Sequence, residues 1–240
     1  MLEIAVLDGS GPSARFVIDV DRLACLAGLR PAAIRVHAAR DPDRRRVETF
    51  LEAIYADAFD GRIRKHYPRL MSLQDGLGGI LAAVGFRFAA EEPLFLEQYL
   101  GRSAEQEIGA AAGAPVSREQ VVEIGSLAST GNGAAIILFL GLAGHLRDLG
   151  CVFAAATATR PLRRIFRRAK FETVELARAD PSRLPDRGAD WGTYYAADPV
   201  VVAGAIAPAL EPLARLLRSG PPVRGRFVCG DLACGPEMSA

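Results

Sequence analysis

The residues best suited to chemistry lie in one short stretch, where a single acid interrupts an apolar segment before a glycine-rich turn. Residues 121–124 read VVEI, β-branched and apolar except for Glu123, which is the pattern of a buried strand. Desolvation in such a strand raises the pKa of a carboxyl group and suits it to act as a general base. Glu123 is therefore the first candidate base. The alternative is a structural glutamate on the solvent-facing side of the strand, paired to an arginine.

The turn that follows is suited to binding an anion. Small residues at 129–133 (STGNG) end the strand pattern, and a long apolar helix begins at Ala134. The first N–H groups of a helix lack partners within it, and with the helix dipole they attract a phosphate. Gly131 and Gly133 let the backbone approach closely. The dinucleotide fingerprint is absent because position 136 is Ile, and no Walker lysine follows. An ordinary strand–turn–helix connection is the alternative.

These residues must be positioned by a strand, a turn and a helix, followed by a second strand and helix. The apolar helix runs from Ala134 to Gly150, where glycine is the expected stop. An apolar strand opens at Cys151, and a basic helix follows from Arg160. This is a βαβ crossover, so we expect Glu123 and the turn amides to face one cleft.

The rest of the chain supplies the surrounding elements. Hairpins are predicted for 2–7 with 15–20 and for 70–73 with 79–88, helices for 47–57 and 103–112, and a strand for 173–177. An apolar helix is predicted from 198–199 onward, with Ala203, Ile206, Leu210, Leu213 and Leu217 as its apolar positions. The segment 70–177 thus reads β–β–α–β–α–β–α–β. Residues 44–46 are interpreted as a solvated helix entrance, with contact to an acidic partner as the alternative.

Composition limits the classes of function. The chain has 240 residues, 50% hydrophobic and 24% charged, which indicates a globular rather than a disordered protein. Its net charge of +1 argues against general polyanion binding. The absence of a secretory signal and of a long apolar run predicts a cytoplasmic protein with reduced thiols, and the scattered histidines predict no metal site. We expect one domain over 1–218, with an N-terminal hairpin extension, and a mobile tail over 219–240.

Five separated phrases resemble the bacterial thermostable hemolysin family. They are LFLEQYL (94–100), VVEIGSLAS (121–129), ATATRPLRRIF (156–166), ARADPSRL (177–184) and WGTYYAADPVVVAGAI (191–206). The resemblance runs from about Phe50 to Ile206. That family is similar to GNAT acyltransferases and, among them, to acyl-homoserine-lactone synthases, which carry an acid comparable to Glu123. The resemblance implies an α/β fold: a GNAT-like mixed sheet with flanking helices and a central βαβ crossover.

The resemblance also implies an N-acyltransferase without a metal. Acyl-CoA or acyl-carrier protein would be the donor, and a small amine or amino acid the acceptor. Glu97 is the second candidate base, with a structural ion pair or helix cap as its alternative, and Ser126 is a further catalytic candidate. Arg160 and Arg163 would grip the 3′-phosphate of CoA or an acidic carrier protein, unless they form a solvated face. The donor-binding turn is assigned to Leu127, Ser129, Thr130, Gly131, Asn132, Gly133 and Ala134.

Two positions depart from the family pattern. Ser126 stands where Asn is usual, so a hydroxyl replaces an amide donor. Phe166 lies seven residues after Thr159, where many GNAT enzymes place a tyrosine that protonates the leaving thiolate. Phenylalanine cannot donate a proton, so either Tyr194 or Tyr195 is the acid or the thiolate leaves unassisted.

Two other functions remain open beside acyl transfer. One is direct lysis of membranes, although the sequence shows no pore-forming amphipathic hairpin. The other is a GNAT-shaped binding module without catalysis, which Phe166 favours. Trp191, Tyr194 and Tyr195 are interpreted as core rather than as an acyl pocket. The expected partners are a small-molecule amine and, for one donor type, an acyl-carrier protein, with neither nucleic acid nor stable membrane insertion.

Overall fold

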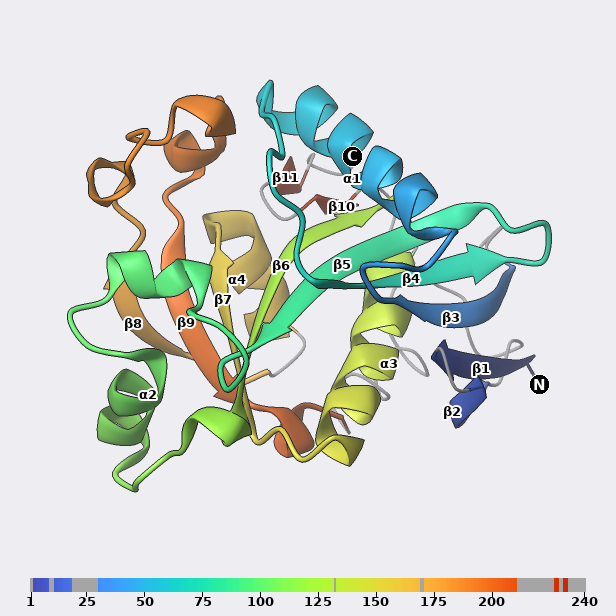
Figure 1. Ribbon diagram of the computed structural model, residues 1–240, viewed down its shortest axis with the longest axis horizontal. Coiled ribbons are helices and arrows are strands. Elements are labelled where there is room, and N and C mark those ends of the chain that lie inside the picture. Colours follow the sequence, from blue (N-terminus) through green and yellow to red (C-terminus); the bar gives the residue numbers. More distant parts are fainter. Residues whose placement is uncertain are drawn as a thin grey trace, which may run out of the picture.

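A mixed sheet with helices on both faces runs through the computed structural model (Figure 1). The structure describes residues 2–8, 11–18, 30–131, 133–168, 171–210, 227–228 and 231–232. The strands are β1 (Leu2–Asp8), β2 (Gly11–Ile18), β3 (Pro31–His37), β4 (Arg69–Asp75), β5 (Ile80–Phe88), β6 (Val121–Ser129), β7 (Phe153–Ala158), β8 (Val174–Arg178), β9 (Val200–Ala205), β10 (Phe227–Val228) and β11 (Asp231–Leu232). The helices are α1 (Arg44–Phe59), α2 (Ala104–Ala112), α3 (Ala134–Asp148) and α4 (Arg160–Arg168). Short 3-10 turns are η3 (Phe95–Tyr99), η4 (Arg118–Gln120), η5 (Pro181–Arg183), η6 (Ala189–Trp191) and η7 (Tyr194–Ala197).

The sheet follows the predicted order of elements. Its strand order is β2-β1-β3-β4-β5-β6-β7-β9-β8. The pairs β1–β3 and β6–β7 are parallel, and the others along this order are antiparallel. Both predicted hairpins are confirmed, as β1–β2 and β4–β5, although residues 19–20 lie outside the described residues. The central crossover is β6–α3–β7, so the predicted βαβ unit is also confirmed.

Two elements differ from the sequence prediction. Strand β3 has a burial pattern that repeats every three residues, so no alternating signal marks it. The apolar helix predicted from 198–199 is wrong over its first part, because β9 occupies that position. A strand covered on both faces is apolar at nearly every position, so its spacing also fits one face of a helix. Residues 206–210 are helical, whereas Leu213 and Leu217 lie outside the described residues.

Helices α1 and α3 cover opposite faces of the sheet, and Figure 1 shows α1 in front of the strands. Successive side chains of β5 point to opposite faces of the sheet, so their contacts distinguish the two faces. Phe86 meets His145 of α3, with ring centroids 6.2 Å apart. Gly85 and Arg87 instead meet Tyr67, which lines a cavity together with Tyr55 of α1. Side chains on the α3 face of β5 therefore contact α3, whereas residues on the α1 face contact Tyr67.

Strand β6 is bent and leaves its neighbour β7 halfway along. Ser126 has φ 49°, a left-handed conformation that is unusual for a residue other than glycine. The pairing of β6 with β5 shifts register in the same region. Parallel pairing with β7 ends at Ile124 opposite Ala156, while β7 continues alongside β9 as far as Ala158. The two central strands therefore splay apart after Ile124.

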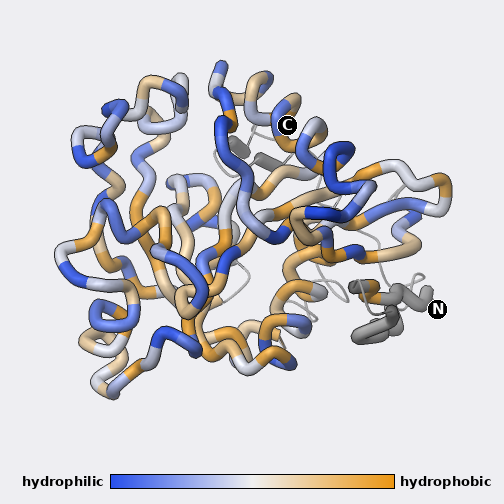
Figure 2. Tube along the Cα trace, viewed as in Figure 1, coloured by the Kyte–Doolittle hydropathy of each residue, from blue (hydrophilic) through white to orange (hydrophobic). Residues whose placement is uncertain are grey.

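The core explains why α3 holds its place against this bent strand. Figure 2 shows α3 hydrophobic along most of its length, and its buried positions surround the helix. Leu138 and Leu142 are almost fully buried in the main core. Truncating such a leucine to alanine typically costs about 2–5 kcal/mol. The tail predicted over 219–240 lies outside the described residues except for β10 and β11, and β10 pairs with Ala128 and Ser129.

Candidate active site on the splayed strand

Glu123 is buried at the start of the splay, with 1% of its side chain exposed. Oε1 accepts hydrogen bonds from Tyr67 Oη at 3.0 Å and from the backbone N–H of Leu96 at 3.2 Å. Oε2 accepts one from the backbone N–H of Phe95 at 2.7 Å. Arg87, directly opposite on β5, brings Nε to 3.3 Å from Oε2. The solvent-facing placement of Glu123 is therefore wrong, while the arginine partner in that alternative is present.

Burial controls the ionisation of this carboxyl group. Desolvation raises the pKa of Glu123 to about 7, against the opposing effects of Arg87 and the three hydrogen-bond donors. Arg87 offsets only part of this rise in the pKa of Glu123, because its buried Nε makes no aligned hydrogen bond among the described residues. A carboxyl group that titrates near neutrality both accepts and returns a proton readily, which suits a general base.

The ring of Tyr67 fills a slot above two facing glycines. Gly85 of β5 and Gly125 of β6 are partners across the strands. A Cβ on Gly85 would lie 2.6 Å from Tyr67 Cδ2, and a Cβ on Gly125 would collide with Tyr67 Oη. The guanidinium of Arg87 lies over the ring, 4.5 Å from its centroid. The slot thus sets the phenol beside Gly125 and against Glu123, and burial raises the pKa of Tyr67 well above its usual value.

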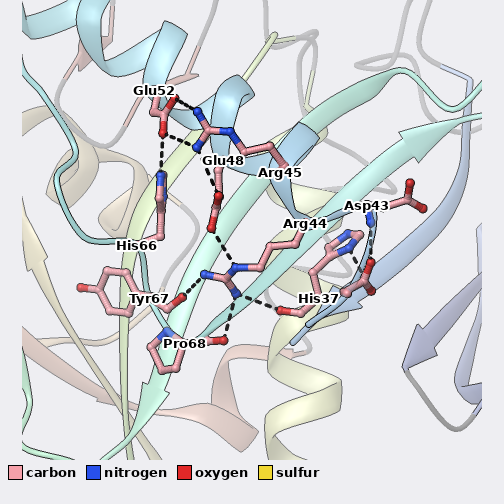
Figure 3. Close-up of polar contacts among 10 residues, drawn as sticks. His37, Asp43, Arg44, Arg45, Glu48, Glu52, His66, Tyr67 and Pro68 are labelled. Carbon is pink, nitrogen blue, oxygen red and sulfur yellow. Dashed lines mark hydrogen bonds and ion pairs between the residues drawn. The ribbon is translucent and has the colours of Figure 1, made fainter. Parts of the chain in front are cut away.

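A buried arginine holds the backbone around Tyr67. Arg44, at the start of α1, donates from Nη2 to the carbonyl of Tyr67 at 2.6 Å (Figure 3). Its Nη1 donates to the carbonyls of Pro68 at 2.9 Å and His37 at 3.3 Å, and its Nε donates to Glu48 Oε1 at 2.8 Å. The planar guanidinium matches these fixed acceptors. Arg44 therefore fixes the segment from which the phenol extends.

The two arginines after Arg44 are exposed to solvent, as the predicted helix entrance requires. The side chains of Arg45 and Arg46 are 70% and 58% exposed, so the prediction for residues 44–46 is wrong at Arg44 alone. The residue before Tyr67 is held separately, since His66 Nε2 lies 3.0 Å from Glu52 Oε1 (Figure 3). Two anchors therefore secure a loop that has no regular secondary structure.

Aromatic rings enclose a cavity of about 30 Å³ on the α1 face. Its lining consists of Tyr55, Tyr67, Phe95, Tyr99, Ile124, Gly125, Ser126, Thr157, Trp191, Tyr194 and Tyr195. Trp191 lies 5.8 Å from Phe95 and 5.3 Å from Tyr194 between ring centroids. Tyr194 belongs to the core, as predicted, and Trp191 and Tyr195 pack against it. The three residues also form a wall of this cavity, which the sequence interpretation did not include.

A second cavity, of about 80 Å³, is apolar and lies on the α3 face. Its lining includes Leu127 of β6, Phe139 and Ala143 of α3, Ala155 of β7 and Phe166 of α4. The volume exceeds the roughly 10–15 Å³ that a single water requires, and the walls offer that water few polar partners. The space is therefore suited to an apolar chain.

The two cavities meet at one peptide of the bent strand. Ile124 and Gly125 line both of them, the aromatic cavity on the α1 face and the apolar cavity on the α3 face. This peptide lies where β6 and β7 separate. Ser126 lines the aromatic cavity and Leu127 the apolar one, so alternate residues of the splay face the two spaces. Glu123 lines neither cavity and meets the aromatic one through Tyr67. The described residues of the glycine turn line neither cavity, so the expectation that Glu123 and the turn amides face one cleft is wrong for both spaces.

The glycine turn has the backbone conformation that its residues suggest. Gly131 has φ 102° and Gly133, the residue before α3, has φ 84°. Several of its amides already have partners: Thr130 N–H donates to the Leu81 carbonyl, Gly131 N–H to Ser129 Oγ and Ala134 N–H to the Gly131 carbonyl. Within the described residues, the Gly133 N–H has no recorded partner, and Asn132 lies outside them. The turn's capacity for a phosphate therefore depends on fewer amides than its sequence suggests.

Both carboxylate oxygens of Glu97 accept hydrogen bonds that stabilise the local structure. Its oxygens accept hydrogen bonds from the backbone N–H groups of Leu94 and Ala104, both at 2.9 Å, and from Arg118 Nη1 at 2.7 Å. These contacts are the helix cap and ion pair of the predicted alternative. They hold η3, whose first N–H groups bind Glu123, so Glu97 supports the base from a distance.

Arg160 and Arg163 both contact one aspartate. Arg160 Nη2 donates to Asp198 Oδ2 at 3.1 Å, and Arg163 Nη2 to the Asp198 carbonyl at 3.3 Å. Arg178 adds a third contact, to Oδ1 at 3.2 Å. Asp198 therefore neutralises part of the basic face. Arg164 remains exposed on the same helix, as the solvated-face alternative predicts.

Sequence reasoning singled out Glu123 as a candidate, and it did not single out Tyr67 or Arg44. Neither missed residue lies in a motif, because Tyr67 is in a loop and Arg44 reads as one of three arginines in a row. The pair of small residues in β5 and β6 was an available signal, since a glycine inside a strand often marks a close approach. The partner that approaches them cannot be read from the strands themselves.

The described part of the chain contains no group of three or more His, Cys, Asp or Glu side chains placed to hold a metal ion. None of its helices has both the length and the apolar character needed to cross a bilayer.

The fold of this chain is similar to that of several solved structures. Among solved structures, TofI in an apo form is 16% identical, with a TM-score of 0.53, over 75% of this chain and 95% of that chain. A CoA-dependent acyl-homoserine lactone synthase, BjaI, with MTA, is 13% identical, with a TM-score of 0.52, over 78% of this chain and 89% of that chain. These likenesses concern the fold, and they confirm the predicted GNAT-like mixed sheet. A search of curated proteins found no match.

The family comparison covers both cavities and all the residues around Glu123. Residues 37–210 match the family model described as "Thermostable hemolysin". This range is well over half of the 240 residues, and it begins just before α1 and ends after β9. The chain belongs to the thermostable hemolysin family.

Proposed function

We propose that this protein is an N-acyltransferase that moves an acyl group from a thioester donor, acyl-CoA or an acyl-carrier protein, to a small amine. One observation carries the proposal: an apolar cavity and an aromatic cavity, the latter backed by a buried acid, share the splayed peptide Ile124–Gly125. An acyl chain lying in the first cavity would bring its carbonyl to that peptide. An amine in the second would approach the same carbonyl from the opposite face of the sheet.

Proton transfer follows from the order of the hydrogen bonds. The bound ammonium gives a proton to Tyr67 Oη as the phenol passes its own proton to Glu123 Oε1, 3.0 Å away. The phenol is too weak an acid to ionise alone, so it acts as a relay and Glu123 holds the proton. The tyrosine therefore contacts the substrate, and the glutamate behind it is the base.

Bond changes at the carbonyl complete the reaction. The freed amine attacks the thioester carbon, the C–N bond forms, and the C–S bond breaks with the electron pair leaving on sulfur. The attacking nitrogen loses its second proton to the thiolate. The products are an amide, a thiol and one proton held by Glu123, which later passes to solvent. A backbone N–H of the splay near Ser126 and Leu127 would stabilise the carbonyl oxygen as it gains charge.

Donor binding is assigned to the end of β6 and the glycine turn. The Gly133 N–H at the start of α3 would meet a phosphate of the donor, and Arg160 or Arg163 would leave Asp198 for another. Phe166 lies in the wall of the apolar cavity, with its ring 6.3 Å from Phe139. We therefore assign it to the acyl chain, and the thiolate leaves without a tyrosine acid at that position.

Two measurements test the proposal. Octanoyl-CoA at about one hundred times its Kd should stabilise the protein by about 2.7 kcal/mol, which is roughly 5–10 °C in Tm for a chain of this size. A mixture with primary amines should then release free CoA thiol at a rate that depends on the amine. A binding module without catalysis would show the shift alone. A membrane-lytic protein that is not an acyltransferase would show neither result, although it would release dye from lipid vesicles.

A further inference from the structure

The aromatic cavity differs from the rest of the site in its charge. Its lining contains rings, hydroxyl groups and small residues, and no lysine, arginine or histidine. The nearest described cation in the network is Arg87, which lies over the Tyr67 ring and faces Glu123 and Glu92 at 3.3 and 3.7 Å. The cavity therefore presents electron-rich rings without a positive partner for an anion.

This environment favours a cation. Aromatic faces attract an ammonium group within about 6 Å of the ring centroid, and the attraction grows when water is excluded. Rings contributed by η3, η6 and η7 surround the space, and Glu123 adds a carboxylate one hydrogen bond behind Tyr67. The Tyr99 and Tyr195 hydroxyl groups bind each other at 2.6 Å, so part of the polar lining is already satisfied. The head group that fits is a protonated amine.

The same environment disfavours a carboxylate next to that amine. An α-amino acid would bring its carboxylate into the cavity, where the lining offers no cation to pair with it. It would also approach Glu123, which shares its sign of charge.

We propose that the acceptor is a primary amine whose amino-bearing carbon carries no carboxylate, so that amines are acylated and the corresponding α-amino acids are not. This inference rests on the proposed acyl transfer and narrows its acceptor class. The cavity selects the head group by charge, and the remainder of the acceptor lies outside it.

Matched acceptors separate these factors. With octanoyl-CoA as donor, thiol release is compared for phenethylamine, phenylalanine and phenylalanine methyl ester, which keeps the branch and removes the charge. Phenethylamine is expected to exceed phenylalanine in kcat/KM by at least about a hundredfold, since a buried unpaired carboxylate costs several kcal/mol. The ester has no negative charge, so its kcat/KM is expected to lie much closer to that of phenethylamine than to that of phenylalanine. A Trp191→Leu variant keeps an apolar wall and loses a strong cation-binding face, so the KM for phenethylamine should rise about three- to tenfold with the KM for octanoyl-CoA unchanged.

The results of these assays distinguish a failure of the proposed acceptor class from a failure of the proposed acyl transfer. Comparable turnover of phenylalanine and phenethylamine, or preference for phenylalanine, overturns the acceptor class and leaves acyl transfer standing. If none of the three acceptors supports thiol release, the inference is overturned as well. If neither octanoyl-CoA nor an octanoyl-carrier protein then gives a shift in Tm, the proposed function fails as well.

Discussion

At the scale of single residues, the site depends on how one phenol and one carboxylate share a proton. Glu123 accepts from Tyr67, Phe95 and Leu96 while Arg87 faces it without an aligned hydrogen bond. A carboxyl group held by three donors and an arginine would ordinarily have a low pKa, yet burial wins and raises it to about 7. The chemistry of the site thus follows from how completely the bent strand and η3 exclude water.

Tyr67→Phe tests the relay directly. The ring remains in its slot below Arg87, and the hydroxyl that links the cavity to Glu123 is lost. Amine-dependent thiol release is expected to fall by about 10²–10⁴-fold, the usual contribution of general acid–base catalysis.

The matched control is Ser72→Ala on β4. It removes a buried hydroxyl that binds His37 and Gln74, away from both cavities, so it should lower Tm with activity largely retained. If Tyr67→Phe keeps near-normal turnover while its Tm falls like that of the control, Tyr67 has a structural role and the relay is wrong.

At the scale of elements, the bend in β6 and the slot beside it make the site. The bend separates β6 from β7 after Ile124, and the glycine pair at 85 and 125 admits the Tyr67 ring to the same region. A strand with ordinary side chains would remain paired and would keep the ring away. The backbone therefore decides where the phenol and the carboxylate meet.

Gly125→Ala should break this arrangement. Its methyl group would collide with Tyr67 Oη, and overpacking of this kind typically costs about 1–3 kcal/mol. Displacement of the phenol by about 1 Å is expected to lower kcat/KM roughly a hundredfold. Gly76→Ala, in the β4–β5 turn, places a methyl in open space and serves as the control. Equal activity in the two variants would show that the slot does not position Tyr67.

Elements with a regular pattern could be predicted from the sequence, and the site only in part. The crossover was readable because a β-branched strand at Glu123, a turn of small residues and a long apolar run that ends at a glycine follow one another in the sequence. Strand β9 was mistaken for a helix because both of its faces are buried. Tyr67 was beyond reach, since its place is set by two glycines and by Arg44, all distant in sequence and outside any motif.

At the scale of the whole molecule, the sheet separates the two cavities that the proposed reaction assigns to its two substrates. The α3 face holds an apolar cavity and the α1 face an aromatic one, with contact between them where the central strands part. In the proposed mechanism the acyl chain would lie on the α3 face and the cationic amine on the α1 face. The reaction would then take place at the one peptide that both cavities share.

Ala143→Phe tests this division. Ala143 lies on α3 in the wall of the apolar cavity, and the larger ring would fill space assigned to the acyl chain. Each buried methylene contributes about 0.8 kcal/mol, so kcat/KM for octanoyl-CoA should fall at least about tenfold, while acetyl-CoA changes less than about twofold. Ala110→Phe on the exposed side of α2 is the control. An equal loss for both donors would place the acyl chain elsewhere.

The most direct test of the account is the pH dependence of kcat/KM for phenethylamine, measured as thiol release with octanoyl-CoA saturating. Because the raised pKa of Glu123 is about 7 before the amine binds and the base must be deprotonated, kcat/KM should be level well above pH 7 and fall tenfold per pH unit below it. Glu123→Gln should lower the plateau about 10²–10⁴-fold and abolish the bend, which separates this carboxyl from ionisation of the amine. A bend that persists in Glu123→Gln, or a wild-type profile without one, would contradict the assignment of the buried acid on β6 as the base.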